Sequence, residues 1–167
     1  MKKKMMICEI GCGDQKVMED SIGIDIRKTK EVDIIADAYK LPFKDGCFDH
    51  VYSSHAIEHF SHCEVKEVLR EWVRVLKERG TFELRCPDLR ARALLFFMRP
   101  SWKNVKNIYG GQDFPENYHK CGFSYKMLKE LLEQVGIKRV RRILRRRGYM
   151  GIPFLPDCLH VKGVKAH

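Results

Sequence analysis

Residues 4–14, KMMICEIGCGD, decide the fold of this chain. The apolar run that ends at Ile10 predicts a buried strand, and Gly11 and Gly13 follow it at once. Glycines in this place let the backbone approach a ligand that a Cβ atom would repel, at the strand end where parallel sheets bind ligands. G-x-G is a weak signal alone, and Lys16 stands where a dinucleotide fingerprint would have its third glycine. The stretch therefore indicates a nucleotide-type pocket and disfavours a dehydrogenase.

Further strands alternate with helices along the chain. Apolar and β-branched runs predict strands at 21–25, 32–36, 47–54, 81–85, 137–145 and 159–165. Apolar residues at three- and four-residue steps predict a helix from about Ser61 to Gly80, and a second capped helix is predicted over 124–135. Between them we expect an irregular, aromatic-rich insert at about 88–121. This alternation predicts one α/β domain over residues 1–167 with a mainly parallel sheet.

Composition bounds the class of protein. The seven cysteines are odd in number, scattered and never spaced C-x-x-C, so neither a disulfide framework nor a zinc ribbon is expected. The basic start has no signal-peptide core, and the longest apolar run, 93–98, is far short of a membrane span. The sequence thus predicts a cytoplasmic protein that does not cross a membrane.

The net charge of +10 is local. Residues 138–147, KRVRRILRRR, hold seven basic and no acidic residues, and residues 2–4 are three more lysines. Such a patch could bind a nucleic acid or another anionic surface. The simpler interpretation, which we favour, is an edge strand whose charges block pairing with other sheets.

Two aspartates follow the next two predicted strands. Asp25 ends the strand at 21–25, where a carboxylate can accept hydrogen bonds from both hydroxyls of a ribose. Asp37 follows the strand at 32–36, where it could accept from the exocyclic amine of adenine. Either aspartate alone is more often a turn or cap residue, so the signal is the ordered set.

The ordered motifs EIGCGD, IGIDI, IADAYKLPFKDGCFDHVYSSHAIEHF and EVLREWVRVLKERGTFELRCPD closely resemble class I S-adenosylmethionine-dependent methyltransferases over at least residues 5–88. Later segments are similar to small members of the methyltransferase-11 type. The resemblance implies a Rossmann-like fold with a seven-stranded sheet, helices on both faces and a truncated N-terminal helical part. It implies S-adenosylmethionine as the cofactor, with these cofactor-binding residues: Glu9 (steadying the loop), Gly11, Cys12, Gly13, Asp25, Ile26, Asp37, Ala38, Ser53, Ser54 and His55.

The stretch SSHAIEHF at 53–60 permits a second interpretation. His55-x-x-Glu58-His59 fits an inverted zinc-protease motif, which requires its residues on a continuous helix. His55 is expected where a strand exits, so we favour a cofactor wall and predict no metal site; each histidine could also be an ordinary hydrogen-bonded one.

Only residues 14–24 separate Gly13 from Asp25, so the helix that is usual there in the family must be very short or absent. We expect an open pocket on that side of the sheet, or a partner chain such as a second copy covering it, because a bare apolar sheet face is costly.

The predicted activity is methyl transfer to an unidentified acceptor, with a small molecule or saccharide intermediate favoured. If the acceptor is a hydroxyl or a protonated amine, a general base is needed, and His55, His59 and His119 are the candidates. Three alternatives stay open: a cofactor-binding regulatory or scaffold module without turnover, an RNA or protein methyltransferase that uses the arginine-rich patch, and a hydrolytic metalloprotein.

Overall fold

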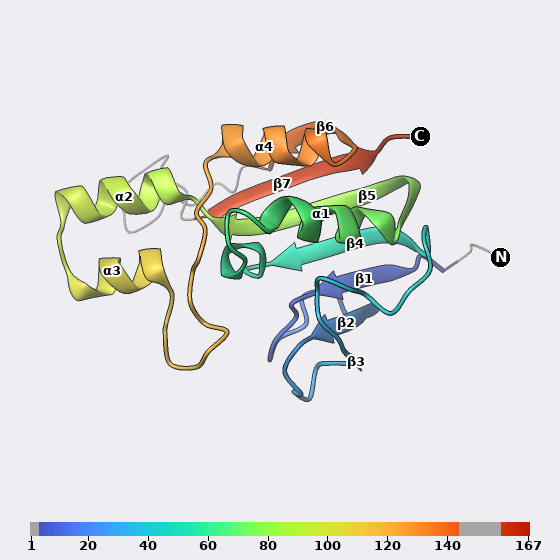
Figure 1. Ribbon diagram of the computed structural model, residues 1–167, viewed down its shortest axis with the longest axis horizontal. Helices are drawn as coiled ribbons and strands as arrows, with labels where there is room; N and C mark the ends of the chain where they lie inside the picture. The colour runs from blue at the N-terminus through green and yellow to red at the C-terminus, as the bar shows by residue number, and fades with distance from the viewer. Residues whose placement is uncertain (1–3, 144–157) are drawn as a thin grey trace.

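The structure is a computed structural model that describes residues 4–143 and 158–167. Within these residues the strands are β1 (Ile7–Ile10), β2 (Ser21–Asp25), β3 (Ile34–Ile35), β4 (Phe48–Ser54), β5 (Leu76–Pro87), β6 (Ile137–Arg142) and β7 (Cys158–Lys165). They form one sheet in the order β3-β2-β1-β4-β5-β7-β6 (Figure 1). β1 to β5 pair in parallel, whereas β7 is antiparallel to both β5 and β6. The predicted seven-stranded, mainly parallel sheet is confirmed.

The helical elements are η1 (Ile57–His59), α1 (Val65–Arg74), α2 (Leu89–Met98), α3 (Trp102–Tyr109) and α4 (Tyr125–Gln134). α1 and α4 lie over the same face of the sheet, whereas α2 and α3 lie beyond the carboxyl ends of the parallel strands (Figure 1). Among the described residues no helix spans a membrane, since none is both long and apolar enough.

The core lies between the sheet and the α1–α4 layer. Strand alternation sends Ile10, Phe82 and Val161 to this face, where each is at most 1% exposed. The apolar stripe of α1 packs onto them through Trp72, which is fully buried and whose Nε1 donates to Ala38 O at 3.0 Å. The apolar residues whose spacing predicted this helix therefore form the stripe that covers the central strands.

The opposite face of the sheet is polar. One row across the strands carries Glu9, Tyr52, Glu83 and Lys162, in the registered pairs of β1, β4, β5 and β7. Glu83 accepts from His160 Nε2 at 2.6 Å and from Lys162 Nζ at 3.1 Å. Paired charges therefore occupy positions that a second helical layer would cover, so this face is not a bare apolar one. Whether a partner chain covers this face stays a prediction.

The segments between β1 and β2 and between β2 and β3 contain turns and no helix, and both lie within the described residues. This agrees with the short spacing of Gly13 and Asp25. Helices on the second face of the sheet would have to begin in these segments. The α/β class is as predicted, with its helical layer built from α1 and α4.

The predicted end of the first helix and the predicted start of the strand that follows it were both wrong. α1 ends at Arg74 and not near Gly80, because the chain from Leu76 onward pairs with β4 and belongs to β5. Lys165 Nζ on β7 also binds the carbonyl oxygens of Val73 and Leu76, each at 2.7 Å, and so stabilises the end of this helix. Gly80 is needed for space, since a Cβ there would lie 2.6 Å from Leu76 Cδ1.

The insert at 88–121 is more regular than expected, because it contains α2 and α3. Asp88 caps α2 by accepting from Arg90 N, and Ser101 caps α3 by accepting from Asn104 N. The basic strand β6 is at the sheet edge, as its favoured interpretation requires. Residues 144–147 of the arginine-rich stretch 138–147 lie outside the described residues.

The chain has two tryptophans in opposite environments, which provides a matched test of the core. Trp72→Ala removes a fully buried side chain, and we expect it to lower the free energy of unfolding by about 3–5 kcal/mol. Trp102 is 87% exposed, so Trp102→Ala should change the same quantity by less than about 0.5 kcal/mol. Urea unfolding followed by circular dichroism measures both; equal losses would contradict this packing.

The ion pairs on the polar face make the free energy of unfolding depend on pH. His160 and Lys162 lower the pKa of Glu83 from 4.5 to about 2. A lowered carboxyl pKa contributes stability above 4.5, and the contribution is lost as pH falls toward 2. We expect about 3 kcal/mol of unfolding free energy to disappear over that window from this group. Urea unfolding of Glu83→Gln should show lower stability at pH 7 and a shallower acid loss; an unchanged pH profile would contradict the assignment.

Candidate functional site

A cavity of about 540 Å³ opens at the carboxyl ends of the parallel strands. Four segments form its wall: the turn after β1, the tips of β2 and β3, the chain from β4 into η1, and the end of the insert. The volume falls within the 300–1,000 Å³ typical of small-molecule sites. The cavity therefore gathers segments that are far apart in the sequence.

The turn after β1 depends on glycine. Gly11 has φ +70° and Gly13 has φ +55°, in the left-handed region that other residues rarely adopt. A Cβ on Gly11 would lie only 2.5 Å from Ala56 Cβ. The backbone of this turn therefore passes directly against the segment that follows β4, and no side chain fits between them.

Glu9 holds the loop beyond this turn. Its carboxylate is 2% exposed and accepts from Val17 N at 2.8 Å, from Met18 N at 2.9 Å and from Ser21 Oγ at 3.0 Å. These bonds replace the helix that other chains of this topology would need to order the segment. Glu9 therefore stabilises the loop and does not line the cavity.

Asp25 ties the glycine turn to β2. Its Oδ2 accepts from Gly13 N and its Oδ1 from Arg27 N, both at 2.9 Å. Each carboxylate oxygen has two lone pairs, so each can still accept a hydrogen bond from a ligand. Asp37 is exposed at the wall beyond β3, and its Oδ1 accepts from Tyr39 N at 3.0 Å. Two carboxylates therefore border the same cavity.

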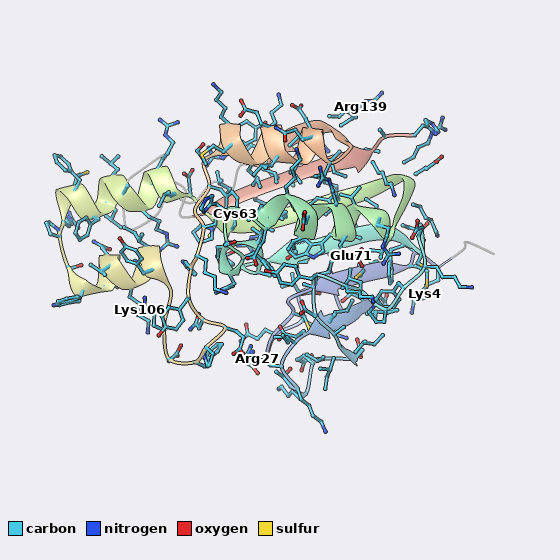
Figure 2. All side chains as sticks on the ribbon, viewed as in Figure 1. Lys4, Arg27, Cys63, Glu71, Lys106 and Arg139 are labelled. Carbon is cyan, nitrogen blue, oxygen red and sulfur yellow. The ribbon has the colours of Figure 1, made fainter. Side chains whose placement is uncertain are left out.

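The insert closes the cavity from the side opposite the glycine turn. The guanidinium of Arg27 lies 4.7 Å from the centre of the Phe114 ring, which joins the segment after β2 to the loop after α3. Figure 2 labels Arg27 at this junction. Further along, Lys120 N and Cys121 N both donate to Glu58 O, at 2.8 and 3.1 Å. The loop is thereby fixed to the wall at both ends.

His55 follows β4 in the left-handed conformation, with φ +56°. Its Nε2 lies 3.5 Å from Cys158 Sγ and its Nδ1 lies 3.1 Å from Glu58 Oε1. Contact with Cys158 and with the Glu58 carboxylate raises the pKa of His55 above its usual value. The ring is therefore a cation at neutral pH, paired with Glu58.

His59 and His119 face one another across the cavity wall, with ring centres 5.2 Å apart. His59 Nδ1 lies 3.1 Å from Tyr118 O, and His119 Nδ1 lies 3.1 Å from Ile108 O. A carbonyl oxygen only accepts, so each Nδ1 is the donor. Burial lowers the pKa of His119, which favours the neutral form of its ring.

Comparison with known proteins agrees with this geometry. Residues 8–84 match the family described as "Methyltransferase domain". The match covers just under half of the chain, so residues 8–84 of the 167 are similar to a methyltransferase domain.

A curated relative and solved structures are also similar to this chain. The chain is 35% identical over 88 residues to the uncharacterized protein MJ1252 of Methanocaldococcus jannaschii, an alignment that covers 46% of this chain and 34% of that protein. The chain thus spans about a third of this curated relative. A methyltransferase of Archaeoglobus fulgidus matches with TM-score 0.66 and 18% identity, over 96% of this chain and 86% of that one. One from Methanosarcina mazei matches with TM-score 0.66 and 18% identity, over 99% and 94%. These structures share the fold.

S-adenosylmethionine, the methyl donor that the sequence resemblance implies, fits the cavity. The wall offers what this molecule requires: a turn without side chains at Gly11, free acceptor positions on Asp25, and apolar surface from Ile26 and Ala38.

The residues predicted to bind the cofactor divide into two groups. The cavity wall contains Gly11, Gly13, Asp25, Ile26, Asp37, Ala38 and His55. Glu9, Cys12, Ser53 and Ser54 lie outside it. Strand alternation turns Ser53 into the core, where its Oγ donates to Ile10 O at 2.9 Å. Cys12 is 7% exposed, with its Sγ 3.9 Å from Glu31 O.

Sequence reasoning missed Glu58 and Lys120 as wall residues. Glu58 was visible in the His-x-x-Glu-His pattern but was judged only as part of a protease motif. Phe114 and Lys120 lie in the insert, and no local spacing relates them to β1 or β2. The predicted candidates His55, His59 and His119 all reach the wall.

Gly11 and Gly136 allow the energetic cost of backbone strain to be measured apart from the cost of a steric clash. Both Gly11 and Gly136 have positive φ, but a Cβ on Gly136 would meet nothing within 4 Å. We expect Gly136→Ala to lower the free energy of unfolding by about 1–2 kcal/mol through strain alone. Gly11→Ala should cost about 1–3 kcal/mol more because it collides with Ala56. Urea unfolding of both variants measures the difference, and equal costs would contradict the close contact.

Proposed function

We propose that this protein is a methyltransferase that transfers the methyl group of S-adenosylmethionine to a small polar acceptor, with a hydroxyl-bearing molecule such as a saccharide intermediate favoured. One observation carries the proposal: the glycine turn, both strand-tip aspartates and three histidines line one cavity. The glycine turn and the aspartates suit an adenosine-bearing ligand, and the histidines suit a reacting polar group beside it.

The proposed cofactor position follows from the wall. The methionine part would pass Gly11 and Gly13, where no Cβ intrudes. Asp25 would accept from the ribose hydroxyls, and Asp37 from the adenine amine, with Ile26 and Ala38 against the ring. The sulfonium would then lie toward His59 and His119, which are among the wall residues that these groups leave free.

The reaction is an in-line displacement. The acceptor atom forms a bond to the methyl carbon while the carbon–sulfur bond breaks and its electron pair returns to sulfur, giving the demethylated thioether. The donor is already activated, so the protein chiefly aligns the three atoms, which alone can remove about 7–11 kcal/mol of barrier. An acceptor hydroxyl must also release its proton.

His119 fits proton removal better than His55. The pKa of His55 is raised and its ring is paired with Glu58, so it holds a proton at neutral pH. Burial lowers the pKa of His119, and its Nδ1 donates to Ile108 O, so the neutral ring has its acceptor nitrogen at Nε2. His119 is therefore the candidate for the general base.

The shape of the site supports a small acceptor over RNA or protein. Insert residues Phe114, Asn117 and Lys120 form part of the wall, so the reacting end is covered by the chain itself. The basic strand β6 is at the edge of the sheet, separated from β1 by β4, β5 and β7. A nucleic acid bound along β6 would therefore lie away from the cavity. Its affinity would fall steeply with salt, and a flat salt response would remove that alternative.

Asp25→Asn tests the cofactor site by calorimetry with S-adenosylmethionine. Loss of a buried charged acceptor should weaken binding by about 10- to 100-fold, the equivalent of about 1.5–3 kcal/mol. Asp20 is 72% exposed and pairs only with Lys4 among the described contacts, so Asp20→Asn is the matched control and should bind normally. Equal affinity in the two variants would contradict the proposed position.

Turnover is tested separately with methyl-labelled S-adenosylmethionine and fractionated small-molecule extract. We expect labelled product in the small-molecule fraction, and a drop of at least about 100-fold in rate for His119→Ala if it removes the acceptor proton. Tight binding without any labelled product would favour the alternative of a regulatory or scaffold module. Label in RNA or protein alone would favour the other acceptor classes.

A further inference from the structure

The geometry points to a divalent transition-metal site at the acceptor end of the cavity, formed by Glu58, His59 and His119. One ligand atom from each of these residues lies within 4.8 Å of the others. A carboxylate and two imidazoles form the donor set of the two-histidine, one-carboxylate sites that leave coordination positions open. An ion bound to His119 would occupy the nitrogen that the proposed general base needs, so the two roles of His119 exclude one another. Metal binding is measured without the cofactor, so this proposal does not depend on methyl transfer.

A buried carboxylate oxygen of Glu58 that has no hydrogen-bond partner in the described part of the chain indicates that a ligand belongs here. Its side chain is 1% exposed, yet Oε2 has no hydrogen-bond partner among the described residues. A buried carboxylate oxygen without a partner is costly and rare. Oε1 is already bound to His55 Nδ1, which fixes the orientation of the carboxylate and leaves Oε2 as the oxygen without a described partner. A cation between Oε2 and the imidazoles would satisfy it.

The two imidazoles are held as metal ligands usually are. His59 Nδ1 donates to Tyr118 O and His119 Nδ1 donates to Ile108 O, each at 3.1 Å. A ligating histidine typically donates its other ring nitrogen to a carbonyl or carboxylate, which fixes the tautomer and the ring orientation. In both rings Nδ1 is engaged, which leaves Nε2 as the nitrogen that can bind an ion.

His55 completes the arrangement without being a ligand. Its ring holds Glu58 from outside the cluster, through Nδ1 to Oε1. This is where the protease interpretation of His-x-x-Glu-His departs from the structure. The left-handed conformation of His55 keeps it off the short helix η1, so it cannot share a helical face with His59. His119, from the insert, takes the place that the motif would have given to His55.

The donor set indicates the class of ion. Two of the three ligands are imidazole nitrogens, which suit zinc, iron, cobalt and nickel better than magnesium or calcium. A tetrahedral or octahedral ion held by three protein ligands keeps at least one open position, here facing the same cavity that the cofactor-binding wall borders. A hydroxyl group bound there would lose its proton more easily, because a bound cation lowers the pKa of its oxygen ligands. The site would thus select acceptors with an oxygen ligand.

The test uses the full chain without an affinity tag, dialysed against a chelator and titrated with Co²⁺ and with Zn²⁺. Co²⁺ is followed by its visible absorption, and both ions by calorimetry. We expect one equivalent to bind. His119→Ala and Glu58→Gln should each weaken binding by about 10- to 100-fold or more, while circular dichroism stays unchanged. Glu58→Gln keeps the size of the side chain and removes its charge.

A neighbouring pair provides the matched control. His62 Nε2 lies 3.4 Å from Cys63 Sγ, and Cys63 is exposed, so this pair could bind a soft ion by itself. The double variant His62→Ala/Cys63→Ala should keep the one-equivalent site. A thiolate-to-cobalt absorption band in the wild type that disappears in this double variant would report binding at the wrong place.

Each outcome decides the proposal. One equivalent in the wild type and the control, lost in His119→Ala and Glu58→Gln, supports it. No binding to the dialysed chain, binding that ignores both ligand variants, or binding lost only with His62 and Cys63 overturns it. S-adenosylmethionine affinity, measured separately on metal-free protein, reports on the proposed function, so the failure of one is distinguishable from the failure of the other.

Discussion

The contact between Gly11 and Ala56 is the constraint on which the site depends. The chain leaves β1 through a left-handed turn and passes so close to Ala56 that even a methyl group would not fit. This contact fixes the spacing between the β1 turn and the start of η1. The cavity lies next to this contact and is lined by both segments. Asp25 and Glu9 hold the turn from two sides, because each accepts from backbone N–H groups of the same loop.

The sheet has one apolar and one polar face, and this explains how the chain manages with few helices. α1 and α4 bury the apolar face. On the other face, Glu83 pairs with His160 and Lys162, and Glu9 orders the loop that would otherwise be a helix. Charged and hydrogen-bonded groups need no apolar cover, so the short connections between β1, β2 and β3 cost little. The cover of the cavity comes instead from the insert, through Phe114 and Lys120.

The histidine-rich stretch shows how the same residues can support different chemistries. As letters, His55, Glu58 and His59 match a helical metal motif. The positive φ of His55 breaks that helix and makes His55 a cationic partner of Glu58. The carboxylate and His59 then meet His119, which lies some sixty residues further along the chain. The acceptor end of the cavity is thus a polar cluster with free electron pairs, whichever ligand it holds.

The sequence by itself determined the sheet and the cofactor side of the cavity. Strand runs, the G-x-G turn and the aspartates at two strand tips are local signals, because alternation, backbone freedom and strand ends are properties of a few consecutive residues. Seven of the eleven predicted cofactor residues reached the wall, and Ser53 did not because alternation points it into the core. Only the tertiary structure decided that Leu76 begins a strand, that the second face is polar, and that His119 approaches Glu58. These depend on contacts between distant segments, and no spacing along the chain records them.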